Sequence, residues 1–582
     1  MKTAIAVTCC GLVLASLAFA GGPKPEFAIG ARWLDTDGQP IEAHGGGILE
    51  VDGTYYWYGE NHRLGFGNKT GISVYSSRDL LQWKNEGVAL PKTRVPAEFR
   101  DEGVCERPKV IYNLATRKFV MWMHLDANDY TAASAGVAIS DSPVGPFTLV
   151  RQFRPLTFDY GYKNDRSQQK ERGNTFRDMN LFVDDDGAAY VFYASEENGT
   201  LYLSRLNSEF TDVERPAIQG KTWARVLVDR FREAPAPFKH AGKYYLLTSG
   251  TTGWSPNPAD LAVADSIFGP WVSLGNPAIG PEAETTHRSQ PTFVLPVKGR
   301  PGSFIYMGDR WDGSKLENST YVWLPFTVST EKPIQLHPIE RWDFTIFENK
   351  RAPDLNAVTV KAEATSNGKP TLRWERIPGA DYYRIYRNFH LVATTVDTSA
   401  LPPSQLAGRA FAYSVVAANI AGGTSPMSQP QVVGSGTPSN VYLGDISPDY
   451  WKHGFGPLQR DKGIDGGPLK IAGKVFEKGI GTHAPSEIIY CLGGQYARFQ
   501  AYVGADNALK SEFPYKPSSV SFEVYTDGVL AFRTGTMTGD TPAQLVDIPV
   551  RNVNELKLVV TDAGDGNHYD HADWADAKLT VE

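Results

Sequence analysis

The chain has 582 residues, with 58 Lys or Arg against 65 Asp or Glu, and a formal net charge of −7. A chain of this length forms several domains, and 12% aromatic residues with 56 Gly and 39 Pro are typical of a β-rich protein with many turns. The mildly acidic charge, without a basic patch, argues against nucleic-acid binding. Beyond residue 20 no apolar run approaches the roughly 18 residues of a membrane span, so no membrane insertion is expected.

The first 20 residues predict a secretory signal peptide. Lys2 precedes an apolar stretch, and Ala18-Phe19-Ala20 forms a small-residue cleavage site. We therefore expect a protein that is secreted or periplasmic. The remaining chain keeps Cys105 and Cys491, which fall in different predicted domains. Neither a disulfide, a metal cluster nor a cofactor is expected from them.

Five later segments share one pattern: a polar residue, an apolar run, a short turn and a second, aromatic-rich run. They begin at His44, Glu106, Asp178, Glu233 and Gln290, roughly 50 to 75 residues apart. This spacing leaves room for four antiparallel strands in each repeat, and it predicts a five-bladed β-propeller over residues 27–349. The innermost strand of each blade starts near the axis, so the five leading residues should meet at one end of the channel.

Smaller features of this region have structural interpretations. Three outer hairpins end in Trp83, Phe147 and Trp271, which we expect to pack between blades. The segment Asp184-Asp185-Asp186-Gly187 is predicted to be a hairpin turn rather than a metal loop. Asp309-Arg310 is interpreted as a structural ion pair. The leading residues themselves have an alternative interpretation, in which they satisfy backbone groups at strand starts.

The sequence pattern changes after the predicted propeller. Residues 354–433 have short alternating strands, with Trp374 on one strand and a Tyr-rich strand after it, and they resemble a fibronectin type III domain. Residues 434–439 are predicted to be a linker.

Residues 440–582 contain KGIGTHAPSEIIY, YVGAD and HADWADAKL, and they resemble the NPCBM family of jelly-roll carbohydrate-binding modules. The acidic residues of this segment leave calcium as an alternative, although their spacing fits no EF-hand loop: Asp562, Asp565, Asp570 and Asp573. The predicted fold class is thus all-β: a five-bladed propeller, an immunoglobulin-like (fibronectin type III) sandwich and a jelly-roll β-sandwich.

The propeller region also carries specific motifs, namely AHGGGIL, YYWYGE, CERPKVIYN, FRDMNLFVDDDG, FREAPA, TTGWSPN, SQPTF and GDRW. They resemble glycoside hydrolase family 43, and in particular its exo-β-1,3-galactanase branch. The general family has an Asp base at the start of blade one, where this chain has His44-Gly45-Gly46-Gly47 and no carboxylate. Within the galactanase branch that absence is expected.

The resemblance implies roles for individual residues. Glu233 becomes the general acid, which must hold a proton at neutral pH, so burial and a neighbouring carboxylate should raise its pKa. Gln290 becomes the residue that positions or deprotonates the attacking water, either as the amide or as its imidic tautomer, and Glu106 is the competing candidate for the base. Asp178 should orient the sugar and tune Glu233.

Further contacts follow from the same resemblance. Glu60 and Tyr130 are expected to bind substrate, and Trp254 either stacks on a sugar face or packs between blades. Together these assignments imply an inverting exo-hydrolase that removes galactose from the non-reducing end of β-1,3-galactan, the backbone of arabinogalactans. We expect a monomer whose partner is a polysaccharide, held there by the C-terminal module. Two alternatives stay open: an α-L-arabinofuranosidase or other galactosidase on the same fold, or a carbohydrate-binding propeller without catalysis.

Overall fold

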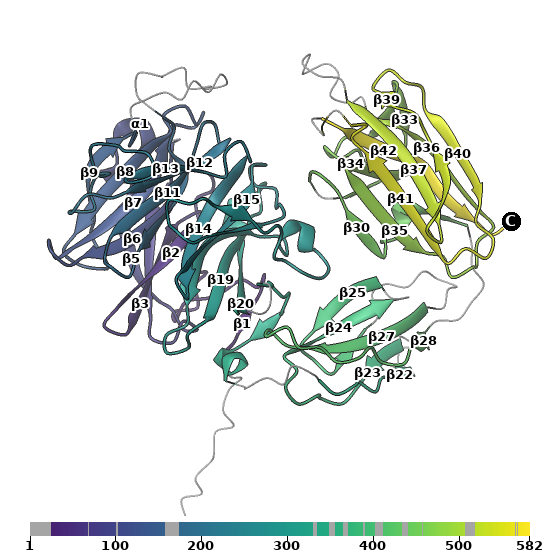
Figure 1. Cartoon of the computed structure of the whole chain (residues 1–582), viewed down its shortest axis with the longest axis horizontal. Coiled ribbons are helices and arrows are strands. Elements are labelled where there is room, and N and C mark those ends of the chain that lie inside the picture. The colour runs from purple at the N-terminus through teal and green to yellow at the C-terminus, as the bar shows by residue number, and fades with distance from the viewer. Residues whose placement is uncertain are drawn as a thin grey trace, which may run out of the picture.

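The computed structural model describes residues 25–582 except 68, 101–102, 157–173, 330–333, 349–354, 365–369, 388–389, 402–410, 434–439, 457, 507–517, 565 and 567–568. The predicted signal peptide and linker lie outside the described residues. In the described part three β-rich units follow one another along the chain (Figure 1). None of the helices described there is long and apolar enough to cross a membrane.

The first unit is the five-bladed propeller that the repeats predict. The strands of blade one are β2 (His44–Val51), β3 (Thr54–Glu60), β4 (Gly71–Ser77) and β5 (Lys84–Pro91). Those of blade two are β6 (Val104–Asn113), β7 (Lys118–Asp126), β8 (Ser134–Ser140) and β9 (Thr148–Phe153). Those of blade three are β10 (Arg177–Val183), β11 (Ala189–Ser195), β12 (Thr200–Arg205) and β13 (Trp223–Val226). Those of blade four are β14 (Arg232–His240), β15 (Lys243–Gly250), β16 (Asp260–Ala264) and β17 (Val272–Ser273).

Blade five closes the ring with help from the N-terminal segment. Its own strands are β18 (Gln290–Pro296), β19 (Ser303–Arg310) and β20 (Thr320–Thr327). Strand β1 (Phe27–Ala28) pairs with β21 (Arg341–Trp342), and the Gly30 backbone N–H donates to the Tyr321 carbonyl of β20 over 2.7 Å. The start of the chain thus contacts the last blade, which links the two ends of the propeller region.

Short helices lie between the strands. They are α1 (Ala97–Arg100), η1 (Lys92–Arg94), η3 (Ala283–Thr285), η4 (Leu316–Asn318), η5 (Phe344–Phe347) and η6 (Leu443–Asp445).

Alternation along the strands explains how the blades pack. In β3, Trp57 joins the apolar cluster between blades five and one, while its neighbour Tyr58 joins the cluster between blades one and two. The same switch separates Met121 and Trp122 in β7. Because successive side chains of a strand point to opposite faces, β3 and β7 each serve two interfaces, and the core is divided into layers between blades.

The smaller structural predictions for the propeller are mostly confirmed. Trp83, Phe147 and Trp271 contact the apolar clusters between blades. Asp184 opens a hairpin turn, since its carbonyl accepts from the Gly187 N–H over 2.9 Å.

Turn chemistry fixes two of the inner hairpins. Asp52-Gly53 joins β2 to β3 with φ of 50° and 76°, and Ala241-Gly242 joins β14 to β15 with φ of 48° and 77°. Two consecutive left-handed residues define a type I′ turn, whose twist matches that of the flanking strands, and glycine adopts this conformation without a steric penalty.

The second unit is a two-sheet sandwich. One sheet holds β22 (Lys361–Ala364), β23 (Pro370–Arg373) and β26 (Ser399–Ala400). The other holds β25 (His390–Thr395), β24 (Tyr382–Arg387), β27 (Phe411–Ala418) and β28 (Gln431–Val433). Trp374 packs on Tyr383 between them, with ring centroids 5.2 Å apart. The architecture is an immunoglobulin-like sandwich, and its fibronectin type III identity stays a prediction.

The third unit is a larger sandwich with six strands in each main sheet. The first contains β29 (Val441–Tyr442), β31 (Gln459–Arg460), β34 (Gly479–His483), β36 (Arg498–Ala505), β40 (Gln544–Pro549) and β42 (His571–Thr580). The second contains β30 (Tyr450–Lys452), β35 (Ser486–Cys491), β37 (Ser519–Thr526), β38 (Val529–Arg533), β39 (Met537–Thr538) and β41 (Glu555–Thr561). A small hairpin joins β32 (Leu469–Ile471) to β33 (Lys474–Phe476).

Two of the acidic residues that left calcium open in this third unit accept hydrogen bonds from backbone groups. Asp570 accepts from the Ser519 N–H over 3.0 Å, and Asp573 accepts from the Lys470 N–H over 2.8 Å. Asp565 lies outside the described residues.

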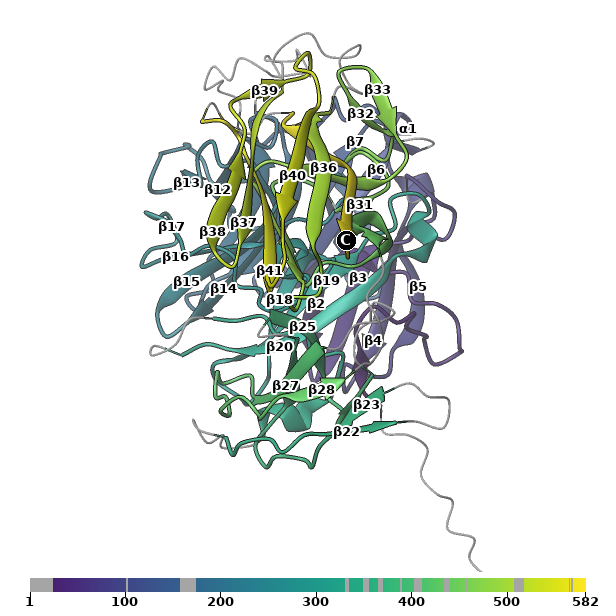
Figure 2. The same cartoon turned by 90° about the vertical axis from the view of Figure 1, so that its right-hand side faces the viewer.

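The middle sandwich contacts both of its neighbours. Tyr382 and Ile420 belong to the same apolar cluster as Trp323 of the propeller. On the other side, the buried Arg387 forms an ion pair with Asp449 of the third unit. Figure 2 shows the three units from a second side. Cys105 and Cys491 are buried in different units, as the sequence predicts.

Candidate active site

One cavity lies where the inner strands of the propeller begin. Its volume of about 550 Å³ is in the range of small-ligand sites. All seven residues that the sequence suggests for the site line it: Glu60, Glu106, Tyr130, Asp178, Glu233, Trp254 and Gln290. Every blade contributes to this set, as the radial repeat predicts. Of the five leading residues, His44 is the one that does not line the cavity.

A β-bulge helps to aim the leading side chains. In blades one, two and four the inner strand shifts register just after its leading residue. The next residue has left-handed backbone in each case, with φ of 58° at Gly45, 54° at Arg107 and 52° at Ala234. A bulge bends its strand and redirects a side chain. In blades two and four the bulge directly follows Glu106 and Glu233, whose side chains line the cavity.

Glu233 has a buried carboxyl group that accepts two amide hydrogen bonds. Gln290 Nε2 donates to its Oε1 over 2.8 Å, and Asn198 Nδ2 donates to its Oε2 over 3.1 Å. Burial raises the pKa of Glu233 well above its usual range, and the negative charge of Asp178 raises it further. A carboxyl group whose pKa is raised in this way, at the wall of a cavity, is suited to act as a general acid.

Gln290 is held in a single orientation by its neighbours. Its Oε1 accepts from Arg107 Nη2 over 2.5 Å and from Trp311 Nε1 over 2.8 Å. These donors require an accepting oxygen, which fits the amide form, because an imidic acid would place an O–H against them. The Nε2 group then faces Glu233 and keeps one N–H for another acceptor.

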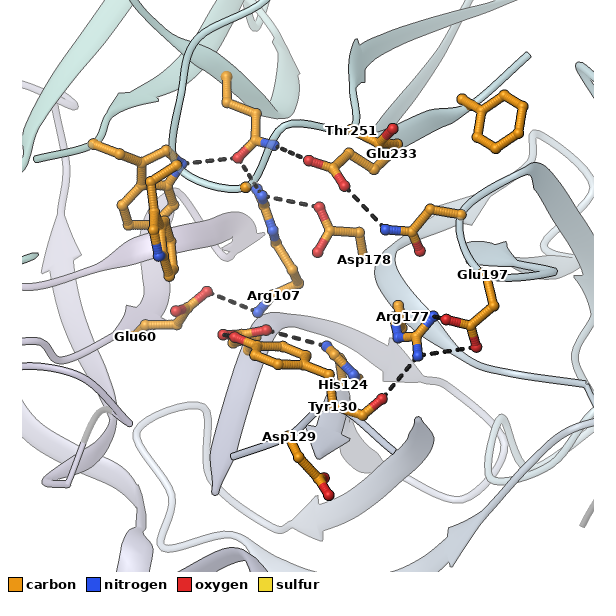
Figure 3. Close-up of a pocket in the computed structure, with 17 residues that line it drawn as sticks. Glu60, Arg107, His124, Asp129, Tyr130, Arg177, Asp178, Glu197, Glu233 and Thr251 are labelled. Carbon is orange, nitrogen blue, oxygen red and sulfur yellow. Dashed lines mark hydrogen bonds and ion pairs between the residues drawn. The ribbon is translucent and has the colours of Figure 1, made fainter. Parts of the chain in front are cut away.

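Arg107 connects several of the site's groups. Its guanidinium forms an ion pair with Asp178, Nη2 to Oδ2 over 3.0 Å, in addition to its bond with Gln290. Its backbone N–H donates to Glu60 Oε1 over 2.9 Å. In Figure 3 Arg107 lies between Glu60 and Asp178. This buried cation offsets part of the negative charge that the carboxylates bring into the cavity.

A second charged group involves Glu106. Its Oε1 accepts from the Tyr130 hydroxyl over 2.8 Å, and its Oε2 lies 3.2 Å from His124 Nδ1. The other ring nitrogen, Nε2, lies 2.8 Å from Asp126 Oδ2. Burial opposes protonation of His124, but its bonds with Asp126 and Glu106 outweigh that effect and raise its pKa to about 9. At neutral pH an imidazolium is therefore held between two carboxylates.

The glycine run in blade one serves close packing. A Cβ on Gly45 would lie 2.0 Å from Glu60 Oε1, and one on Gly47 would lie 2.5 Å from Lys109 Cδ. The glycines therefore make room for Glu60 and Lys109. His44 itself is buried, with Nδ1 3.0 Å from Asp309 Oδ1.

Asp309 and Arg310 do not form the ion pair that the sequence suggested. Asp309 accepts from the Gly45 N–H over 2.7 Å as well as binding His44, whereas Arg310 donates to the His287 carbonyl over 2.9 Å. Neighbouring residues of a strand point to opposite faces, so that pairing had no geometric basis.

Trp254 forms an aromatic part of the cavity wall. Its ring lies 5.0 Å from that of Trp311 in an edge-on arrangement, and it is half-buried. No apolar cluster between blades, as described here, contains Trp254. The indole therefore lies at the cavity wall and outside these described apolar clusters.

Several residues of the site were not identified from the sequence. Arg107 and Trp311 lie inside the motifs CERPKVIYN and GDRW, so a cation next to Glu106 and an indole after Asp309 were available signals. His124 lies in an apolar strand and Asn198 in a turn, where the local pattern gives no indication of function.

Three of the lining residues have donor atoms close enough to suggest a metal ion. Atoms of Glu106, His124 and Asp178 lie within 4.8 Å of one another. Both nitrogens of His124 face carboxylates, however, and Asp178 is paired with Arg107. A metal ion would bind His124 only after displacing one of these two carboxylate contacts.

Comparison with known proteins places these features in context. Residues 43–320 match the family described as Glycosyl hydrolases family 43, and residues 439–580 match the NPCBM/NEW2 domain. A solved family 43 β-1,3-galactosidase with galactodeoxynojirimycin is 39% identical, with a TM-score of 0.50, over 55% of this chain and 100% of that chain. An exo-β-1,3-galactanase from Clostridium thermocellum is 29% identical, with a TM-score of 0.50, over 78% of this chain and 94% of that chain.

Curated relatives share a shorter stretch. Alpha-1,3-galactosidase B of Akkermansia muciniphila is 31% identical over 125 residues, which are 21% of this chain and 15% of that protein. The chain spans 9% and 15% of the length of the first two curated relatives that it matches.

Proposed function

The chain belongs to glycosyl hydrolases family 43, and we propose that it is an inverting exo-glycosidase that releases galactose from the non-reducing end of β-1,3-galactan. The observation that carries this proposal is the environment of Glu233, a buried carboxyl group with a raised pKa at the wall of a cavity of about 550 Å³. The names of the two solved relatives support galactose as the released sugar, and that of the second supports exo action.

In this mechanism Glu233 protonates the glycosidic oxygen as the bond to the sugar breaks. Gln290 orients the attacking water with the Nε2–H that its bond to Glu233 leaves unused, and the proton that the water loses passes to a carboxylate of the cavity, because an N–H donor accepts none. Arg107 and Trp311 occupy the amide oxygen and so fix the orientation of Gln290. Glu106 is the second candidate for the base, since a carboxylate keeps acceptor capacity beyond its bonds to Tyr130 and His124.

The remaining residues would bind and orient the sugar. Asp178 would tune Glu233 through its charge and contact a hydroxyl, and Glu60 and Tyr130 would contact others. Trp254 would cover a sugar face. An oxocarbenium-like transition state carries positive charge, which the surrounding carboxylates stabilise.

The NPCBM/NEW2 domain supports a role in holding the enzyme on its polymer. Linking a binding domain to the propeller raises the local concentration of chain ends without any new contact in the active site. Export, which the predicted signal peptide favours, would bring the protein to such polysaccharides.

The test is galactose release from linear β-1,3-galactan, followed by NMR of the first product. Initial α-galactose would support both the substrate and inversion, and Glu233→Gln is the matched control. Initial β-galactose would contradict inversion. If wild-type protein released no galactose but cleaved an arabinofuranoside, the proposed substrate would be wrong.

A further inference from the structure

The turn between β11 and β12 has an unusual backbone next to the acid. Glu196, Glu197 and Asn198 have φ of 50°, 54° and 64°, so three consecutive non-glycine residues are left-handed. The Gly199 N–H closes the turn on the Glu196 carbonyl over 3.0 Å. Such conformations are unfavourable for residues with a Cβ, asparagine least so, and they persist where the surroundings hold them.

Charged partners hold the two glutamates of this turn. Glu196 is buried and accepts from Arg225 Nε over 2.7 Å, from Arg225 Nη2 over 2.5 Å and from the Tyr202 hydroxyl over 2.6 Å. Glu197 pairs with both terminal nitrogens of Arg177, over 3.1 and 3.2 Å (Figure 3). Bidentate carboxylate–guanidinium pairs fix geometry as well as adding energy. The turn is therefore anchored on both sides of its backbone.

The third residue of the turn contacts the acid directly. Asn198 Nδ2 donates to Glu233 Oε2 over 3.1 Å, while Gln290 Nε2 donates to Oε1. Both oxygens of the carboxyl group are thus held, one from blade three and one from blade five. Asn198 Oδ1 is buried without a hydrogen-bond partner among the described residues, so the side chain has no other bond that would explain its position.

We propose that Asn198 is a positioning residue for the general acid: the anchored left-handed turn holds its amide against Glu233 and keeps the carboxyl group aimed at the leaving oxygen. This inference rests on the proposed function, since it assumes that Glu233 donates a proton. With Gln290 alone, the carboxyl group could rotate about the remaining hydrogen bond. Two donors on opposite oxygens fix its plane, and proton transfer depends on such alignment.

The test compares two substrates that differ in their need for an acid. β-1,3-Galactobiose has an alcohol leaving group that requires protonation, whereas 2,4-dinitrophenyl β-galactoside has one that leaves without it. Asn198→Gly removes the amide and leaves a residue that accepts left-handed backbone freely. Asn552→Gly makes the same change at a left-handed asparagine of the C-terminal unit, with φ of 62°, and is the control.

For Asn198→Gly we expect kcat/KM to fall about 10- to 100-fold on galactobiose, a part of the 10²–10⁴ that general acids supply, and less than about threefold on the dinitrophenyl substrate. Asn198→Asp should also move the alkaline limb of the pH profile to higher pH, because a second carboxylate beside Glu233 raises its pKa.

Equal losses on both substrates, or no loss on galactobiose, would overturn the positioning role. Wild-type protein that cleaves the dinitrophenyl galactoside but not galactobiose would instead contradict the proposed function.

Discussion

Asp178→Asn should shift the pH dependence of the reaction toward acid. Glu233 must be protonated to act as the acid, so kcat/KM falls as the pH rises through its pKa in the free enzyme. The Asp178 charge disfavours ionisation of Glu233, and it also forms an ion pair with Arg107 over 3.0 Å. Removing the charge therefore lowers the pKa of Glu233 in two ways. The repulsion between Asp178 and an ionised Glu233 disappears, and the positive charge of Arg107, no longer offset by Asp178, stabilises the ionised Glu233 more strongly.

The size of this shift follows from the two causes that raise the pKa. A nearby charge in a largely buried site changes a pKa by roughly 1–3 units, and one unit corresponds to about 1.4 kcal/mol. Burial, the larger cause at Glu233, is untouched by the substitution. We therefore expect the alkaline limb to move down by about 1–2 pH units while staying above the range of an exposed glutamate.

The assay is kcat/KM for galactobiose measured from pH 4 to 10 in buffers of constant ionic strength. Asp129→Asn is the matched control, because Asp129 also lines the cavity but is exposed and does not contribute to the pKa shift of Glu233. Asp178→Asn is expected to lower the maximal rate as well, through lost sugar contacts, but the position of the limb is independent of that loss. An alkaline limb that stays in place in Asp178→Asn would refute the electrostatic coupling.

The remaining predictions concern catalysis and stability. Glu233→Gln should lower galactose release about 10²–10⁴-fold with an unchanged melting temperature, and near-normal release would remove Glu233 from the acid role. Gln290→Ala should lower kcat more than Glu106→Ala if Gln290 activates the water; the reverse order in steady-state kinetics would assign the base to Glu106. The pKa of His124 rises on folding from 6.5 to about 9, so its contribution of roughly 3 kcal/mol is full below pH 6.5 and is lost as the pH rises through 9. Urea unfolding at pH 6 and 9.5 should show that loss in wild-type protein but not in His124→Gln, and equal losses in both would contradict it.

The propeller could be predicted because the sequence pattern of one blade recurs five times along the chain. Each blade carries its own alternation and its own leading polar residue, so the number of blades and the meeting of Glu106, Asp178, Glu233 and Gln290 follow from topology alone. The roles assigned to these residues stay predictions, because position near an axis does not define a reaction.

Other parts of the site depend on contacts between distant segments. Arg107 has no local signal that distinguishes a surface cation from one that bonds to Gln290, which is 183 residues away. Asn198 resembles any turn asparagine until blade four places Glu233 beside it. His124 is one residue of an apolar strand, and its pKa is raised because its bonds with Asp126 and Glu106 outweigh the opposing effect of burial.

The sequence by itself determined the all-β class, the repeat and the identity of the groups that surround the axis, since these depend on local period and composition. The tertiary structure alone decided which atoms of those groups face each other, and therefore which contacts and charges raise the pKa of Glu233. The physical reason is that hydrogen bonds and pKa values depend on distance and burial, which blades remote in sequence establish only once the ring has closed.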